Sequence, residues 1–235
     1  DFCLSRGLGD VYKRQPITFD NWNNSKILAY WKYDDATKPG KDSHSWLGRL
    51  NNIRTALQGQ QGDRRLRLGI AGGEWKKMMA DATARTRFAS EVKKIIEQYD
   101  FDGVDFDFEW PTNTNEFNNY SATVIQMRST LGKYVYFTAS LHPVSFKISP
   151  EAIDALDFIS YQCYGPAVMR FPYEQFVKDG EMAITYGIPK NKLVMGVPFY
   201  GSTGSLIAAY YDFVNDGLAT TCLLYTSPSP RDRQK

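Results

Sequence analysis

Short apolar runs alternate with longer amphipathic stretches through most of this chain. Five of the runs are rich in β-branched or aromatic residues and are bounded by turn residues, which is typical of buried strands. These predicted strands are Leu66–Ala71, Val104–Phe108, Tyr134–Ala139, Phe158–Gln162 and Leu193–Val197. Between them, apolar residues recur at helical spacing. The predicted helices are Thr83–Tyr99, a segment from Phe117 to Leu131, one that begins at Ser149-Pro150-Glu151, and about Tyr173–Tyr186.

The order of these elements predicts the fold class. Strands that alternate with helices through short loops form parallel sheets, so we expect an α/β protein with either a (β/α)8 TIM barrel or a doubly wound sheet. No glycine-rich phosphate loop follows the first strand, which counts against the nucleotide-binding sheet. Ahead of Leu66, the pattern of Ile27–Tyr33 suggests a strand and that of Trp46–Gln58 a helix, but their place in a barrel stays open.

The peptides at the two ends of the chain can be encoded by the two complementary strands of one DNA sequence. Ser5–Gln15 can be back-translated so that the reverse complement, read one base in, encodes CLLYTSPSPR, the peptide that begins at Cys222. This pair resembles the tag left by transposon-based preparation of sequencing libraries. We therefore interpret residues 1–15 and 222–235 as non-native flanks around a partial barrel at residues 16–221. The true termini and any targeting signal then lie outside the sequence, and an extracellular or periplasmic location is an expectation for the parent protein only.

Removing the flanks changes the charge and the cysteine count. The flanks carry six basic and three acidic residues, so the chain's net charge of +2 leaves −1 for residues 16–221. The apparent basicity therefore gives no reason to expect a nucleic acid or membrane partner. Cys163 is the one cysteine inside these bounds. A single thiol forms neither a disulfide framework nor a cysteine metal site.

The segment DGVDFDFEWP, residues 102–111, carries the most informative chemistry. Alternate side chains of a strand share a face, so Asp105, Asp107 and Glu109 should project together while Phe106 and Phe108 face the other way. Successive carboxyls would lie about 6–7 Å apart. Crowded, partly buried carboxyls cannot all ionise, so one should retain a proton near neutral pH. A protonated Glu109 would suit acid catalysis of glycosidic cleavage.

Two other interpretations of this segment remain open. It could be a surface strand with an acidic outer face, or a carboxylate cluster that binds a hard cation. Neither explains the glycine after Asp102 together with Trp110-Pro111 directly after Glu109.

The segment resembles the DxxDxDxE signature of glycoside hydrolase family 18, the chitinases and endo-β-N-acetylglucosaminidases. Supporting similarities are the strand that ends in Gly72-Gly73, SYQCYGP at residues 160–166 and MGVPFYG at residues 195–201. The resemblance implies a TIM barrel, incomplete here, and a substrate of β-1,4-linked N-acetylglucosamine. It implies no cofactor and no metal ion.

The resemblance also implies a retaining mechanism in which the substrate assists. Glu109 would protonate the leaving oxygen, and the substrate's 2-acetamido oxygen would attack the anomeric carbon. Asp107 would orient the acetamido group and share a proton with Asp105. Tyr164 matches the tyrosine that holds the acetamido carbonyl. The remaining residues expected at the substrate site or in its support are Asp102, Trp110, Tyr200, Gly73 and Trp75; a core role for Trp75 is equally open.

Three positions depart from the family pattern. Ile70 stands where the family has a serine that bonds the residue matching Asp105, Gly165 where it has Asp or Asn, and Ser202 where it often has Arg. Two alternative functions stay open: an endo-β-N-acetylglucosaminidase acting on N-glycans, and a non-catalytic glycan-binding relative. Because terminal barrel strands should lie outside residues 16–221, we expect the fragment to be poorly folded and inactive while its parent is active.

Overall fold

The computed structural model describes Leu50, residues 54–55, 65–71, 75–164 and 173–197, and the backbone of residues 200–203 and 206–209. These residues fall into two compact units. The first unit contains residues up to 139 together with 148–157, and the second contains residues 140–147 and those from 158 onward.

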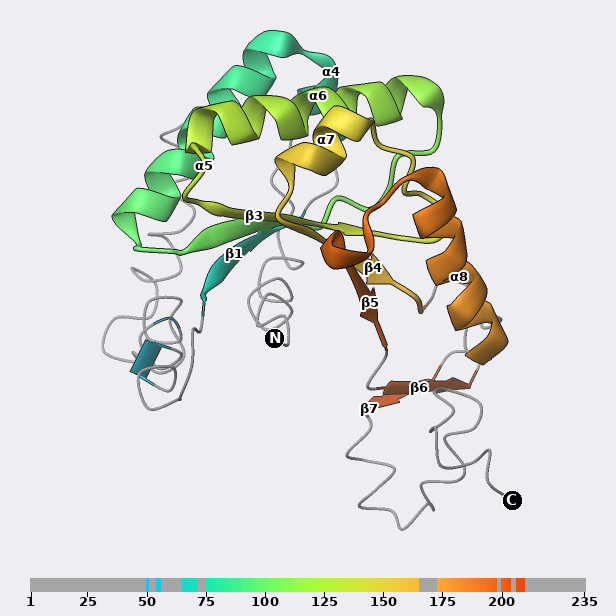
Figure 1. The fold of residues 1–235 in the computed structure, drawn as a ribbon. Helices are drawn as coiled ribbons and strands as arrows, with labels where there is room; N and C mark the ends of the chain where they lie inside the picture. Colours follow the sequence, from blue (N-terminus) through green and yellow to red (C-terminus); the bar gives the residue numbers. More distant parts are fainter. Residues whose placement is uncertain are drawn as a thin grey trace. The chain divides into compact units, whose positions relative to one another are not determined.

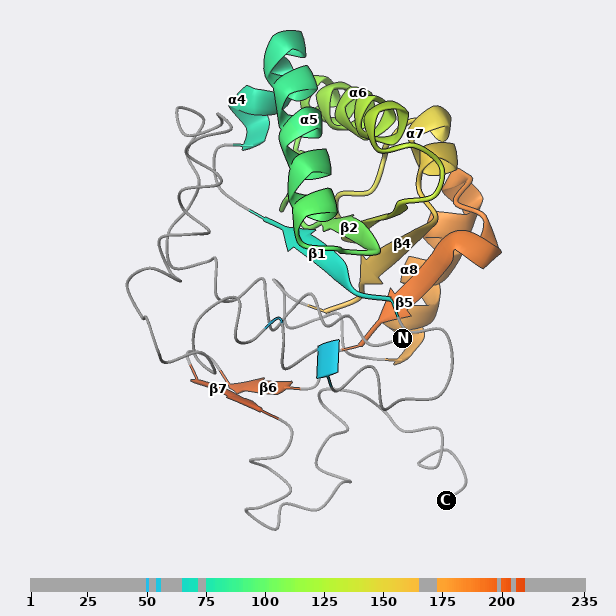
Figure 2. The same ribbon diagram turned by 90° about the vertical axis from the view of Figure 1, so that its left-hand side faces the viewer.

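The first unit is a parallel sheet covered by helices on one face (Figure 1). Its strands are β1 (Arg67–Ile70), β2 (Gly103–Phe106) and β3 (Tyr136–Leu141, of which the last two residues belong to the second unit), and β2 pairs in parallel with both neighbours. Its helices are α4 (Trp75–Ala80), α5 (Ala82–Gln98), α6 (Thr114–Leu131) and α7 (Pro150–Ala155). Turned by 90°, Figure 2 shows α5 and α6 side by side above the strands. The predicted alternation of strands and helices is confirmed.

The helices begin where their capping residues indicate. The side chains of Asp81, Asn113 and Ser149 each accept a hydrogen bond from the backbone N–H three residues later, at the starts of α5, α6 and α7. Each bond satisfies one of the N–H groups that lack a partner in the first helical turn. The predicted cap at Ser149, with Pro150 at the start of the helix, is confirmed.

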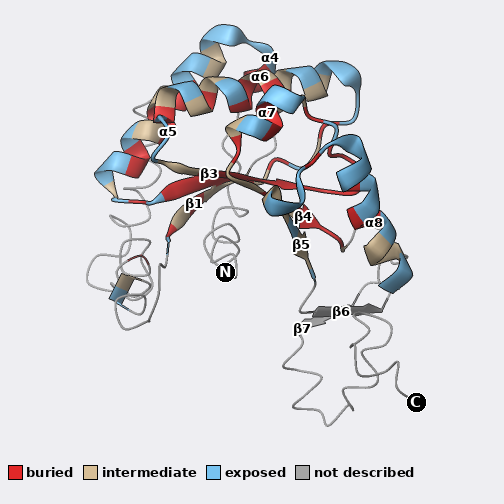
Figure 3. Ribbon diagram, viewed as in Figure 1, coloured by how far each residue is buried: buried red, intermediate tan, exposed pale blue. Residues whose placement is uncertain are grey.

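The core of the first unit lies between the sheet and the helices. Figure 3 shows the buried residues on the strands and on the helix faces turned toward them. The fully buried aromatic side chains there are Trp75, Phe88, Phe106, Phe108, Tyr120 and Phe137. Phe106 is central to this cluster, with ring centroids 4.9 Å from Phe137 and 5.3 Å from Phe108. Burying each such ring stabilises the fold by roughly 1.5–3 kcal/mol.

Two predicted strands are displaced by about two residues. β2 ends at Phe106 rather than Phe108, although the Asp107 N–H still donates to the Ile70 carbonyl at 2.8 Å. β3 begins at Tyr136 rather than Tyr134, because α6 ends at Gly132 with a φ of 80° and a turn follows. Tyr134 lies in that turn and is 88% exposed, so its aromatic side chain was a misleading sign of a strand.

The second unit contains two parallel strands and a hairpin. β4 (Phe158–Gln162) pairs with β5 (Leu193–Gly196), and α8 (Tyr173–Tyr186) with the short 3-10 helix η3 (Lys190–Lys192) lies between them in sequence. β6 (Tyr200–Thr203) and β7 (Leu206–Ala209) form an antiparallel pair that the sequence pattern did not predict. Phe146 packs edge-on against Tyr161 and Tyr186. No helix among the described residues is long and apolar enough to cross a membrane.

Candidate active site

The carboxylate segment divides its side chains between two faces as the alternation predicts. Phe106 and Phe108 are fully buried in the aromatic cluster beneath the helices. Asp105 lies on the opposite face of β2 and is 1% exposed, Asp107 is half-buried, and Glu109 is exposed. The three acids thus pass from the interior of the sheet to its surface in steps of two residues.

Asp105 is held by side chains of both neighbouring strands. Thr138, its register partner on β3, donates its hydroxyl proton to Asp105 Oδ1 in a short hydrogen bond. From β1, Arg67 Nη1 lies 3.4 Å from the same oxygen and also bonds to the Thr138 hydroxyl. A buried carboxylate that has a cation and a hydroxyl donor is compensated for the loss of water.

Ile70 gives Asp105 no side-chain hydrogen bond, as expected where an apolar residue replaces the family serine. Gly69, not Ile70, is the residue of β1 opposite Asp105, while Ile70 pairs with Phe106 on the alternate position. The side chain at position 70 therefore does not share a face with Asp105. Thr138 and Arg67 fill the role of hydrogen-bond partner.

The segment that follows Glu109 is anchored to two helices. Glu116, in the first turn of α6, accepts hydrogen bonds from the Thr112 N–H at 2.7 Å and from the Thr112 hydroxyl at 2.9 Å. It also accepts one from Lys76 of α4 at 2.8 Å. Burial alone would raise the pKa of Glu116, but these bonds and the charge of Lys76 lower it to about 2. Glu116 therefore stays ionised at neutral pH and fixes the chain next to Glu109.

Tyr120 of α6 has a fully buried hydroxyl without a hydrogen-bond partner. Burial raises its pKa well above the ordinary value of 10.0, and the negative charges of Asp105 and Asp107 raise it further. Tyr120 is consequently protonated at neutral pH.

Two other expected site residues do not lie next to Glu109: Asp102 is at the other end of β2, and Trp75 is buried in the core. Asp102 precedes β2, at the opposite end of the strand, and its carboxylate accepts the Leu66 N–H at 2.6 Å. Trp75 is 2% exposed and packs 5.9 Å from Phe108 and 6.2 Å from Tyr120, measured between ring centroids. Of the two interpretations of Trp75, this burial favours the core residue. Trp110 follows Glu109 through a cis peptide bond and is half-buried.

The second unit holds Tyr164 at the end of β4. His142 Nε2 lies 3.0 Å from the Tyr164 carbonyl oxygen, and His142 Nδ1 accepts the Val144 N–H at 3.2 Å. His142 is therefore the neutral tautomer that donates from Nε2 and fixes the Tyr164 backbone. A side chain at Gly196 of β5 would come within 3.3 Å of the Tyr164 ring, so glycine at this position leaves room for it.

Two expected site residues fall outside what the structure describes: Gly73, and the side chain of Tyr200, whose backbone begins β6. Among the described residues, no group of three His, Cys, Asp or Glu side chains is arranged to hold a metal ion.

Arg67 and Thr138 were not singled out from the sequence. A signal was available in Arg65-Leu66-Arg67-Leu68, where polar and apolar residues alternate into β1. Strands of a parallel sheet normally read as continuous apolar runs, so an arginine within one indicates a buried partner of opposite charge.

Comparison with known proteins identifies the family. The sequence model of glycosyl hydrolases family 18 matches residues 14–216. A probable chitinase 2 of Drosophila melanogaster is 28% identical over 182 residues, which cover 64% of this chain and 37% of that protein. An endochitinase of Manduca sexta is also 28% identical and covers 64% of this chain and 34% of its own. The chain thus spans little more than a third of the length of these relatives.

A solved structure shares the fold. A chitinase from Bacteroides thetaiotaomicron superposes with a TM-score of 0.64 at 20% identity, covering 74% of this chain and 62% of its own. The parallel strands and covering helices described above therefore form part of a (β/α)8 TIM barrel. The chain belongs to glycosyl hydrolases family 18.

Proposed function

We propose that the protein containing this chain hydrolyses β-1,4-linked N-acetylglucosamine polymers such as chitin, with Glu109 as the catalytic acid. The observation that carries the proposal is the graded burial of three alternate acidic residues, from Asp105 at 1% exposure through the half-buried Asp107 to the exposed Glu109. Active sites of TIM barrels lie at the carboxyl ends of the strands, which is where Glu109 follows β2.

In the proposed reaction, the proton of Glu109 passes to the glycosidic oxygen as the bond between that oxygen and the anomeric carbon breaks. The substrate's acetamido oxygen bonds to the anomeric carbon and forms an oxazolinium ion. Water then attacks this carbon and gives its proton to Glu109. Asp107 orients the acetamido group, Asp105 supports Asp107, and the Tyr164 hydroxyl binds the acetamido carbonyl. The net configuration is retained without an enzyme carboxylate as nucleophile.

Different roles are proposed for the other residues expected at the site. Asp102 stabilises the start of β2 through its bond to the Leu66 N–H rather than by contact with substrate. Trp110, Tyr200 and Gly73 are proposed to line the substrate site. Family membership and the chitinase relatives favour chitin over the two alternatives, an N-glycan endo-β-N-acetylglucosaminidase and a non-catalytic glycan-binding protein.

A comparison of Glu109→Gln with wild type in the full-length protein tests the proposal. We expect hydrolysis of chitooligosaccharides to fall by roughly 10²–10⁴-fold, since the amide gives up no proton. Glu97→Gln is the matched control, because Glu97 is exposed on α5 and its contact is with Lys93 at 3.9 Å. A high-mannose glycopeptide assayed in parallel separates the two substrate classes. Equal chitooligosaccharide activity of wild type and Glu109→Gln would contradict the assignment.

A further inference from the structure

We propose that Arg67 is a positioning residue for the carboxylate segment: it holds Asp105 from β1 and offsets the negative charge of that carboxyl. In this way it sets the acid limit of the pH range over which Asp105 keeps the charge that supports Asp107. The inference rests on the proposed function, in which Glu109 is the acid and Asp105 supports Asp107.

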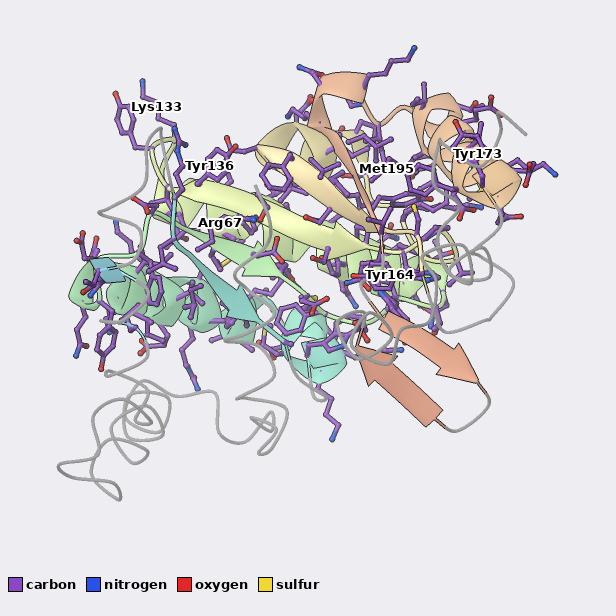
Figure 4. The ribbon with its side chains drawn as sticks, turned by 90° about the horizontal axis from the view of Figure 1, so that it is seen from below. Arg67, Lys133, Tyr136, Tyr164, Tyr173 and Met195 are labelled. Carbon is purple, nitrogen blue, oxygen red and sulfur yellow. The ribbon has the colours of Figure 1, made fainter. Side chains whose placement is uncertain are left out.

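The geometry brings Arg67 to Asp105 through the register of three strands. Arg67 pairs with Gly103 and Gly69 pairs with Asp105, so the residue of β1 directly opposite Asp105 has no side chain. This leaves room for the guanidinium of Arg67 to reach toward Asp105 along the same face. In Figure 4, which looks at the sheet from below, Arg67 is labelled beside β1.

The contacts form a closed triangle. Arg67 Nη1 contacts both Asp105 Oδ1, at 3.4 Å, and the Thr138 hydroxyl oxygen. Since Thr138 accepts from Arg67, its single proton is free to point at Asp105 Oδ1, with which it makes a short bond. Asp105 Oδ1 therefore accepts from two donors, an arrangement that suits a carboxylate oxygen and not a protonated one.

Burial makes the charge of Arg67 effective. The side chains of Arg67 and Asp105 are 10% and 1% exposed, so water screens their interaction little. Removing one partner of such a pair leaves an uncompensated buried charge. From α6, Tyr120 is close enough to Asp105 and Asp107 for their negative charges to raise its pKa.

The sign of the expected pH effect follows from charge. Catalysis requires a proton on Glu109, whose loss ends activity on the alkaline side, and negative charge on the aspartates, whose protonation ends activity on the acid side. A positive charge at position 67 disfavours protonation of Asp105, with which it is in contact. Without it, the acid limb of the pH profile should move to higher pH, whereas the alkaline limb, which reflects the solvent-exposed Glu109 two strand steps further on, should stay in place.

The test compares R67Q, R67K and wild type in the full-length protein by the pH dependence of kcat/KM on chitooligosaccharides. R67Q should shift the acid limb to higher pH and leave the alkaline limb in place, and R67K, which keeps the charge, should move neither. R128Q is the matched control: Arg128 is also partly buried, but it bonds the Ala155 carbonyl and Asp157. It should lower stability without moving either limb. A folded R67Q with the limbs of wild type would overturn the proposal.

Two further measurements test the role of Arg67 if R67Q does not fold or if the wild-type protein is inactive. If R67Q does not fold, the double variant R67Q/D105N should restore folding, because it removes both charges; an equally unfolded double variant would overturn the pairing. If wild type hydrolyses nothing, the proposed function fails, yet ¹³C NMR titration of the aspartate and glutamate carboxyl carbons still tests Arg67. Replacement by Gln should then raise the titration midpoints of the carboxyls near it, and unchanged midpoints would refute the inference.

Discussion

Asp105, Asp107 and Glu109 differ in how far water reaches them, and this difference separates their roles. The fully buried Asp105 needs compensation, which Thr138 and Arg67 provide from the two flanking strands. Glu109 is exposed, so a sugar can reach it. The end of β2 and the residues that follow it therefore combine a buried acid with an accessible one, which is what the proposed supporting and catalytic roles require.

Substitution of Gly103 tests how much the close approach of β2 and β3 contributes to stability. A Cβ at this position would lie 1.9 Å from the Tyr136 carbonyl oxygen, so β3 could not keep its present distance from β2. We expect Gly103→Ala to reduce the free energy of unfolding by roughly 2–4 kcal/mol, as overpacking against backbone does. Chemical denaturation measures this.

Gly132→Ala is the control for Gly103→Ala. Gly132 has open space around it, but its φ of 80° and ψ of 174° are adopted almost only by glycine, so its substitution should cost roughly 1–3 kcal/mol of backbone strain without a steric clash. A smaller loss for Gly103→Ala than for Gly132→Ala would show that close strand approach is not what requires glycine at position 103.

Among the elements, α4 and α6 act together on the segment after Glu109. Asn113 caps α6, and Glu116 joins that helix to Thr112 and to Lys76 of α4. This reciprocal arrangement satisfies N–H groups at the start of α6 and fixes the exit of the chain from the carboxylate strand.

Glu116→Gln should destabilise the fold by roughly 1 kcal/mol at pH 7, through loss of charged hydrogen bonds. The pKa of Glu116 is lowered from 4.5 to about 2, so the stabilisation is complete above pH 4.5 and is lost as pH falls toward 2. Denaturation curves at pH 7 and pH 3 should therefore show a smaller difference between variant and wild type at pH 3. A difference that grows at pH 3 would contradict the assigned direction.

Hydrophobic periodicity was sufficient to predict the five parallel strands, the helices α5 to α8 and the two faces of β2, because it depends on neighbours in sequence; it did not predict α4 or the hairpin of β6 and β7. It could not predict Arg67 and Thr138 as partners of Asp105, since that contact depends on the register between three strands. The ends of strands were set by local features such as Gly132, which periodicity does not register.

At the scale of the whole molecule, activity depends on whether the barrel can close. The structure describes five strands in parallel pairings characteristic of the fold, whereas a (β/α)8 barrel closes with eight. We predict that a polypeptide of residues 16–221 alone will not hydrolyse chitooligosaccharides, because an unclosed barrel exposes strand edges and its interior. Measurable hydrolysis by that purified polypeptide would disprove this.

A second prediction at this scale concerns the ends of the chain. The family match covers residues 14–216, which leaves nearly all of residues 1–15 and 222–235 outside it. We expect the genomic sequence of the source to continue the barrel on both sides and to lack these two peptides. Sequencing of the locus from unamplified DNA would decide the matter; finding both peptides encoded there would refute their interpretation as library tags.

The role of Glu109 as proton donor is tested most directly by varying how much the leaving group needs a proton. In the full-length protein, Glu109→Gln should lose roughly 10²–10⁴-fold in kcat/KM on chitotetraose, whose sugar leaving group must be protonated. On 2,4-dinitrophenyl β-chitobioside, whose leaving group departs as an anion, the first bond-breaking step should slow by less than about tenfold, as a burst of dinitrophenolate would show. An equal loss on both substrates, or none on either, would contradict acid catalysis by Glu109.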